Sequence, residues 1–229
     1  MADLKLVPVP TRILTNKDNI VDAIMEYAGH DITNHDIVCV AESVVAITQG
    51  RYIRPEELHI CWQARLMNRF VPGAGSMASI YGMQAAMEEE GKWNMLFSFI
   101  IGAVAKIFGK AGVFYARCRQ ASLIDDVTGT MPPFDKCLVY GPADTDRVCE
   151  EIKNATGAYG AVIADVNDLK RSAVLGKSKG INPGQIAKIL IDNPFGNDNQ
   201  KTPIVIIKNF TDHINTVSYT HLRAHETAA

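Results

Sequence analysis

The sequence has no excess of charge of either sign. Lysine and arginine number 23 and aspartate and glutamate 25, which gives a formal net charge of −2 at pH 7. The longest block of like charge is EEE at residues 88–90. Nucleic acids and anionic membrane surfaces attract proteins through clusters of basic residues. The composition therefore predicts neither a nucleic-acid partner nor a membrane partner.

Paired cysteines are also missing. The sequence has five cysteines, an odd number, and no CxxC motif. Disulfide frameworks and zinc sites need closer, paired spacing. The opening residues, MADLKLVPVP, lack the long apolar run and the cleavage site of a signal peptide. We therefore expect reduced thiols in a cytoplasmic protein.

No apolar run is long enough to span a bilayer. The longest one, WNMLFSFIIGAVAKIFG at residues 93–109, is interrupted by Lys106. A transmembrane helix needs about 20 apolar residues. The segment instead predicts a helix buried in the core of the protein.

The 229 residues are 47% hydrophobic, which is enough for a substantial core. Alternating or β-branched apolar runs predict strands in LKLVPVP, IVCV, FYARCRQ, GAVIADV and TPIVIIKN. Helices are predicted after a capping box formed by Thr15 and Asp18, through most of residues 55–109, in DRVCEEIKNATG and from Pro183. The stretch SVVAI fits a helix or a second strand. Because the elements alternate without a regular βαβ repeat, the sequence predicts a mixed α+β fold.

Carboxylates follow apolar runs at two places. The first is LIDDVTG, with Asp125 and Asp126, and the second is AVIADVNDLKR, with Asp165, Asn167 and Asp168. Hard cations such as Mg²⁺ and Mn²⁺ prefer oxygen ligands of this kind. The alternative is that each cluster forms Asx turns and helix caps. The metal-site interpretation predicts that Asp125 and Asp165 converge on one cleft.

Two polar stretches are candidates for contacts with a substrate. VLGKSKG offers Lys177 and Lys179 to a phosphate group, or it is a solvated loop. NPFGNDNQKTP offers Asn193, Asn197 and Thr202, or it is a surface connection whose side chains bond its own backbone. We expect the second stretch to border the active cleft.

The order and spacing of several motifs resemble a known family. These motifs are PVPTRILT, DIVCVAESVVAITQGR, LIDD, AVIADVNDL and DNPFGNDNQKTPIVIIK, and they extend from Leu6 to Lys208. Together they are similar to the coenzyme F420-0:γ-glutamyl ligases, in particular to a compact, divergent bacterial branch. The resemblance implies an α+β fold with two interleaved lobes in one domain over residues 1–215, assembled as a homodimer. It also implies ligation of L-glutamate onto a small-molecule carboxylate acceptor, with GTP as co-substrate and Mn²⁺ or Mg²⁺ as cofactor.

The resemblance also assigns residues. By motif, Asp125 and Asp165 match metal-binding acids, and Asn167 stands beside the second of them as a ligand or an orienting residue. The segments that match the nucleotide pocket contain Thr11, Arg12, Ile13, Leu14, Glu42 and Ser43.

The sequence departs from the family pattern at two positions. Ile47 stands where the family has a phosphate-contacting lysine, which leaves Arg12 or Lys177 to replace it, and Val166 replaces a hydroxyl ligand. A ligase for another acid and a non-catalytic binding protein are therefore the alternatives.

The C-terminal segment VSYTHLRAHET matches one reading frame of a transposon-based sequencing adapter. We expect residues 216–229 to form a non-native, disordered tail, with genuine sequence reaching to about Asn215. His221 and His225 are for this reason not candidate metal ligands.

Overall fold

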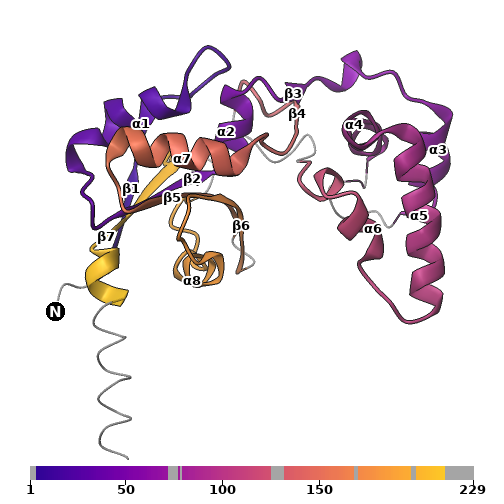
Figure 1. The fold of residues 1–229 in the computed structure, drawn as a ribbon. Coiled ribbons are helices and arrows are strands. Elements are labelled where there is room, and N and C mark those ends of the chain that lie inside the picture. Colours follow the sequence, from indigo (N-terminus) through magenta and orange to yellow (C-terminus); the bar gives the residue numbers. More distant parts are fainter. Residues whose placement is uncertain are drawn as a thin grey trace, which may run out of the picture. The chain divides into compact units, whose positions relative to one another are not determined.

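The structure is a computed structural model that describes residues 4–71, 77, 79–124, 132–167, 170–196 and 200–214. The chain forms two compact units (Figure 1). Residues 4–49 and 142–214 form one unit, called the sheet unit here, and residues 50–141 form the other, the helical unit. The helical unit is therefore an insertion in the sequence of the sheet unit. The α+β class predicted from the sequence is confirmed. The assignment of residues 1–215 to one domain stays a prediction, and the predicted tail at residues 216–229 lies outside the described residues.

The sheet unit is built on a five-stranded sheet with the strand order β1-β7-β2-β5-β6. Strands β2 and β5 are parallel, and the other neighbouring pairs are antiparallel. The strands are β1 (Lys5–Val9), β2 (Ile37–Ala41), β5 (Gly160–Asn167), β6 (Arg171–Lys177) and β7 (Ile204–Lys208). The sequence predicted all of these except β6, part of which was interpreted as a phosphate-binding or solvated loop.

Helices cover both faces of this sheet (Figure 1). On one face lie α1 (Ile20–Ala28), α2 (Glu42–Thr48) and α7 (Thr145–Thr156), and on the other lies α8 (Pro183–Ile189). Alternate side chains of each strand point to opposite faces. Val38 and Val40 accordingly pack in the core beside α1 and α7, whereas Ile37 and Cys39 pack in the core beside α8.

The ends of these helices follow local signals in the sequence. Gly157 ends α7 with a φ of 70°, a left-handed conformation that glycine adopts without strain. Pro183 opens α8 behind the Asn182 cap. The predicted capping box is wrong for α1, because the side chain of Asn19 caps this helix. Asp18 instead accepts hydrogen bonds from Thr15 and Arg12 in the preceding turn. A one-turn 3-10 helix, η1 (Gly29–Asp31), follows α1.

The helical unit packs four α-helices around a core rich in methionine, within its described residues. They are α3 (Trp62–Asn68), α4 (Ile80–Glu90), α5 (Lys92–Ile107) and α6 (Val113–Arg117). Two short 3-10 helices, η2 (Pro55–Glu57) and η3 (Gln120–Ser122), and a small sheet of β3 (Tyr52–Ile53) and β4 (Leu138–Val139) complete it.

The strand predicted for FYARCRQ is wrong, because most of this segment is α6 and η3. Tertiary packing explains the difference. The Phe114 ring lies edge-on to Phe99 of α5, with 6.2 Å between the ring centroids. Gly102 of α5 lets the two helices approach, since a Cβ atom there would lie 3.0 Å from Phe114 Cβ. An aromatic run with β propensity is thus held as a helix by its neighbour.

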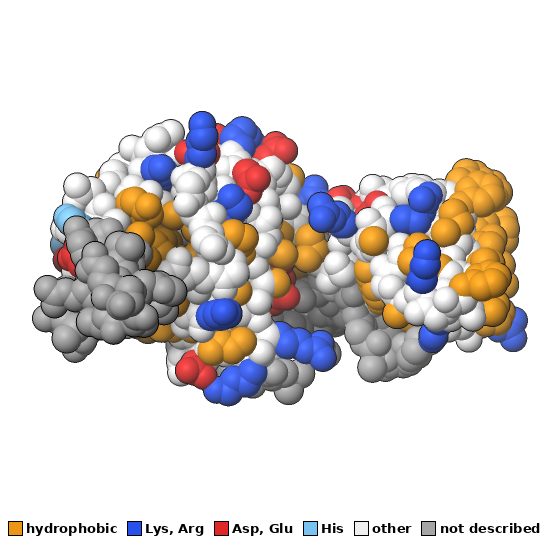
Figure 2. Space-filling view, turned by 60° about the horizontal axis from the view of Figure 1, so that its bottom comes forward, with side chains coloured by type: hydrophobic (Ala, Val, Ile, Leu, Met, Phe, Trp, Pro, Cys, Tyr) orange, Lys and Arg blue, Asp and Glu red, His pale blue; other side chains and the backbone are white. Residues whose placement is uncertain are grey.

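Helix α5 is also more exposed than the sequence predicted. It is helical, but the expected burial is wrong: only Met95 and Ser98 are buried. Large apolar side chains emerge along one side of the helix, and beyond its end Phe108 is 77% exposed. Figure 2 shows hydrophobic side chains gathered over part of the helical unit. In the described part of the chain, no helix has the length and apolar character needed to cross a membrane.

All five cysteines are free, which confirms the prediction of unpaired thiols. Burial raises the pKa of Cys149 to about 12, and burial also raises the pKa of Cys39. Both thiols are therefore protonated at neutral pH and act as small apolar core residues.

Candidate functional site

The parallel pairing of β2 and β5 brings two carboxylates to one edge of the sheet. Ala41, the last residue of β2, is the register partner of Ala164 in β5. The residue after each alanine is an acid: Glu42 is the first residue of α2, and Asp165 lies within β5. Neighbouring strands lie about 4.8 Å apart. Glu42 and Asp165 thus occupy adjacent positions where the two strands run out of the core.

The antiparallel strands bring hydroxyl groups to the same edge. The register of β7 with β2 ends at the pair of Val40 and Ile204, and it continues through a 2.9 Å hydrogen bond from Ala41 N to Pro203 O. Thr202 therefore precedes β7 beside the position of Glu42. Strand β1 ends nearby, where Thr11 N donates to Lys201 O at 2.8 Å. Residues from four distant segments thus meet at one edge.

The side chain of Asp165 lies on the α1/α7 face of the sheet. Ala161 and Ile163 pack in the core on that face, whereas Val162 and Ala164 pack on the α8 face. Strand alternation therefore turns Asp165 toward the layer that also contains α2, which packs against β5.

Burial determines the electrostatics of this edge. Glu42 is 9% exposed, and Asp165 is half-buried. Loss of solvent raises the pKa of Asp165, because the charged carboxylate is poorly hydrated there. A cation at this edge would replace part of the missing hydration. The arrangement therefore favours the binding of positive charge.

The segment of Thr11, Arg12, Ile13 and Leu14 divides into core and surface residues. Leu14 belongs to the core on the α1/α7 face, and Ile13 is exposed. The Arg12 guanidinium forms two hydrogen bonds to Asp18, at 2.9 and 2.6 Å, and holds the pKa of that carboxyl well below its usual range. Arg12 is thus already engaged in an exposed ion pair, which a phosphate group would have to replace.

The structure also describes Ser43 and the two positions that depart from the family pattern, Ile47 and Val166. Ser43 is half-buried in the first turn of α2. The Ile47 side chain is 6% exposed and belongs to the interior. Val166 is half-buried and packs against the core on the α8 face, the face opposite to that of Asp165. Neither Ile47 nor Val166 supplies the polar contact that the resemblance implies at its position.

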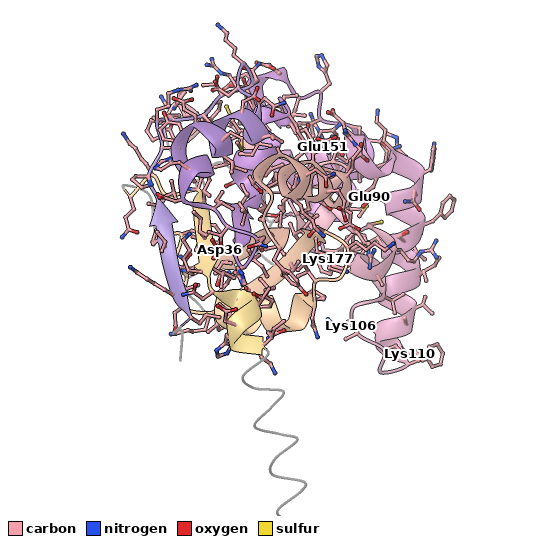
Figure 3. The ribbon with its side chains drawn as sticks, turned by 60° about the vertical axis from the view of Figure 1, so that its left-hand side comes forward. Asp36, Glu90, Lys106, Lys110, Glu151 and Lys177 are labelled. Carbon is pink, nitrogen blue, oxygen red and sulfur yellow. The ribbon has the colours of Figure 1, made fainter. Side chains whose placement is uncertain are left out.

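Lys177 lies away from this edge. Its register partner is Val162, three residues before Asp165 on β5. Asp146 and Glu150 of α7 accept hydrogen bonds from the main-chain N–H groups of Lys177 and Lys179. These two N–H groups already have acidic partners and are not free to bind a phosphate group. Binding of phosphate by the Lys177 side chain stays a prediction. Figure 3 shows Lys177 in the sheet unit.

The loop before β7 reaches the site only at its end. Within the loop, Thr202 Oγ1 donates to Phe195 O, and Gly196 N donates to Asn193 O at 3.0 Å. These bonds agree with the alternative of a self-bonded connection. An ion pair between Lys170 and Asp192 joins the loop to the β5–β6 turn. A role of Asn193 and Thr202 in binding stays a prediction.

Asn167 takes part in the turn between β5 and β6, since its Oδ1 accepts a 3.3 Å hydrogen bond from Arg171 N. This is the turn chemistry that the sequence left as the alternative to metal binding. Asp125, Asp126, Asp168 and Asn197 lie outside the described residues, so the predicted convergence of Asp125 with Asp165 stays a prediction.

The oxygen groups described at this edge are of the type that a hard cation prefers, but they are too few to complete its coordination shell. Glu42 and Asp165 offer carboxylate oxygens, and Thr11 and Thr202 offer hydroxyls. Within the described ranges, no group of three or more His, Cys, Asp or Glu side chains is placed to hold a metal ion. Mg²⁺ is commonly held by one or two carboxylates, with substrate phosphates completing its shell. The described residues therefore fit a metal that arrives with a nucleotide.

The sequence contains a signal for the pairing of Glu42 with Asp165. The segments CVAE and VIAD share a pattern, a β-branched run followed by alanine and an acid. Two such strands, paired in parallel and in register, place both acids side by side. The position of Asp125 after an apolar run predicts a different partner for Asp165, and that prediction lies outside the described residues.

The described residues thus place acids and hydroxyls of a mixed α+β scaffold at one sheet edge. The family model described as F420-0:Gamma-glutamyl ligase matches residues 8–189. The chain belongs to this family of ligases. The match ends before the loop that contains Asn193 and Thr202. Comparison with curated proteins gave no match.

Proposed function

We propose that the protein is a GTP- and divalent-metal-dependent ligase that joins the amino group of L-glutamate to a carboxylate acceptor. The observation that carries the proposal is the register pair of Ala41 with Ala164, because the residue that follows each of these alanines is an acid, Glu42 or Asp165. Membership of the ligase family supports the reaction class.

The chemistry requires activation, because a carboxylate does not react with an amine at neutral pH. A carboxylate oxygen of the acceptor takes the γ-phosphoryl group of GTP, and GDP leaves. The glutamate nitrogen then attacks the acyl carbon, the C–N bond forms, inorganic phosphate leaves and the nitrogen loses a proton. Such reactions depend mainly on positioning and on stabilising charge.

In this proposal Glu42 and Asp165 would hold Mn²⁺ or Mg²⁺ together with the nucleotide. The metal would spread the charge of the transferred phosphoryl group. Thr11 and Thr202 lie at the same edge. Their hydroxyl protons bond Arg12 O and Phe195 O, and their oxygens are placed to accept a hydrogen bond from a substrate N–H or O–H group. The assignments of Asp125 and Asn167 as further ligands remain part of the proposal.

The test uses protein ending at Asn215. GTP consumption should require both an acceptor acid and L-glutamate. Asp165→Asn should abolish turnover and most of the thermal stabilisation by Mn²⁺ and GTP, which amounts to about 2.7 kcal/mol at a hundredfold excess over Kd. Asp22→Asn, at an exposed acid of α1, is the matched control. Full turnover by Asp165→Asn would contradict the proposal.

A second function is favoured by one observation. Ile47 is buried where the resemblance implies a phosphate-contacting lysine. A binding protein of this family that has lost catalysis would accept the same ligands without turnover. Stabilisation by GTP and Mn²⁺ with no release of GDP would establish this alternative.

We also propose that the protein is a cytoplasmic homodimer. Its five free thiols suit a reducing compartment. One side of α5 exposes Trp93, Phe97, Ile100 and Val104, and contiguous apolar surface of this kind marks interfaces. Light scattering should give a dimer mass that Ile100→Lys reduces to a monomer mass. Met25→Lys, at an exposed apolar residue of α1, should leave the mass unchanged.

A further inference from the structure

The helical unit contains a cavity of about 470 Å³ between α3, α5 and α6. Sites for small molecules are typically about 300–1,000 Å³ in volume. The cavity is formed within residues 50–141, whereas the acids Glu42 and Asp165 belong to the sheet unit. Its size is therefore suited to a small molecule.

The walls of the cavity are almost entirely apolar. The rings of Phe70, Phe99 and Phe114 follow one another, with centroid separations of 6.5 and 6.2 Å. Tyr115 continues this wall, 5.2 Å from Phe114. The remaining lining includes the thioethers of Met67, Met77 and Met83. Methionine side chains are flexible and polarizable, so this wall can adapt to the shape of an apolar ligand.

Helix α5 presents a different stripe to the cavity from the one that it exposes. Phe99, Gly102, Ala103 and Lys106 line the cavity and follow the i, i+3, i+4, i+7 spacing of one helix face. The exposed apolar stripe with Ile100 and Val104 falls on the opposite face by the same geometry. The cavity is therefore a feature distinct from the surface proposed for dimerisation.

A single charge lies in this apolar lining. Among the described residues that line the cavity, Lys106 is the only one with a charged side chain. No ion pair joins it to an acid in the described part of the chain. Figure 3 shows Lys106 at the end of α5, near Lys110. An apolar cavity with one ammonium group and one phenol is complementary to a ligand with an apolar body and one anionic end.

We propose that this cavity binds a monocarboxylic acid with an apolar body, whose carboxylate pairs with Lys106 while its body lies against the phenylalanine and methionine side chains. The shared chemistry is an apolar chain or ring that bears one carboxylate. The site does not rest on the proposed ligase function, because none of its residues belongs to the sheet edge described above.

The first experiment uses decanoate as the probe, below its micellar concentration, with binding to the full chain measured by calorimetry. A chain of about ten carbons suits a cavity of this size class. Lys106→Gln should weaken decanoate binding about tenfold, the loss of one charge-assisted hydrogen bond. Lys110→Gln is the matched control, since Lys110 does not line the cavity, and it should bind as the unaltered protein does. Decanol, which lacks the charge, should bind equally to all three proteins.

The second experiment fills the cavity. Ala103→Trp places an indole on the cavity face of α5 and should abolish decanoate binding, whereas Val104→Trp on the opposite face should preserve it. Circular dichroism checks that both variants keep their helix content. The proposal is overturned if the unaltered chain does not bind decanoate, if Lys106→Gln binds it as tightly as Lys110→Gln, or if Ala103→Trp still binds it. It is also overturned if Ala103→Trp lowers the oligomeric mass of the protein in the absence of decanoate. The cavity would then be occupied by a second copy of the chain and not by a small molecule.

Discussion

Asp36 is the acid with the clearest structural role at the residue scale. It is 1% exposed and lies just before β2. Its carboxylate accepts hydrogen bonds from Thr33 N at 2.8 Å, from Lys208 Nζ at 2.9 Å and from Asn209 N at 3.0 Å. It thereby ties the start of β2 to the end of β7. Figure 3 shows Asp36 in the sheet unit.

We predict that Asp36→Asn lowers the free energy of unfolding by about 3 kcal/mol, because it leaves the Lys208 ammonium beside an uncharged amide. Burial alone raises the pKa of Asp36, but its hydrogen bonds outweigh burial and hold the pKa below its usual value. The stabilisation is therefore present above the unfolded pKa of about 3.9 and is lost as the pH falls through the folded pKa. Urea denaturation at pH 7 and at acid pH should show the difference shrinking with acidity. Asp31→Asn, at an exposed carboxylate, should have little effect at either pH.

At this scale the sequence predicted residue types better than partners. Asp165 follows a buried strand as expected, and Glu42 and Thr11 came from the resemblance. Their meeting at one edge depends on the order of strands that are far apart in sequence, which no local pattern contains. Arg12 is a different case, because its partner Asp18 is only six residues away and a capping-box pattern also fits that acid.

At the scale of elements, the close contact of α7 with β6 depends on Gly176. A Cβ atom added there would lie 2.3 Å from Thr145 Cβ and 2.7 Å from the main-chain carbon of Thr145. The hydroxyl of Thr145 also donates to Leu175 O at 2.9 Å, which fixes the start of the helix on the strand. Rotation of the Thr145 side chain would not make room for the methyl group of an alanine at position 176, because the Thr145 backbone is also too close.

We predict that Gly176→Ala lowers the free energy of unfolding by about 3 kcal/mol, at the upper end of the usual cost of overpacking. Gly184→Ala in α8 is the matched control, because its nearest contact would be an ordinary 3.5 Å. Alanine is the better helix former by up to about 1 kcal/mol, so the control should be neutral or stabilising. Equal stabilities for the two variants, measured by urea denaturation, would contradict the role assigned to Gly176.

The elements show where sequence patterns succeed and fail. Strands β2, β5 and β7 are central and buried, so their apolar runs predict them directly. Strand β6 lies at the edge of the sheet, and its mixed sequence RSAVLGK is half-exposed. Helix α5 has a uniformly apolar sequence that predicts burial, yet one of its sides faces solvent in a single chain. That side is the surface proposed above for dimerisation, and an apolar pattern alone does not distinguish an interface from a core.

At the scale of the whole molecule, hydrogen bonds join the two chain segments that cross the boundary between the units, and each unit has its own set. The side chain of Gln49 exchanges two hydrogen bonds with the main chain of Ala143, at 3.0 and 2.8 Å, within the sheet unit. In the helical unit, Arg51 Nε donates to Gly141 O at 2.6 Å, and Tyr140 N donates to Arg51 O at 3.0 Å. The two ends of the insertion are thus paired on both sides of the boundary. Inserted units whose ends lie close together can be removed without disrupting the host.

We therefore predict that the sheet unit folds without the helical unit. Replacing residues 50–141 with a short glycine–serine linker should leave a protein that unfolds in a single cooperative transition, with dispersed amide resonances in its NMR spectrum. The paired ends at Gln49 and Ala143 should tolerate a short linker, because their hydrogen bonds already hold them together. Adding Gln49→Ala to the shortened chain should cost about 1–2 kcal/mol of stability, the value of a hydrogen-bonded side chain at this junction. A shortened protein with collapsed amide dispersion and no cooperative transition would show that the sheet unit depends on the insertion to fold.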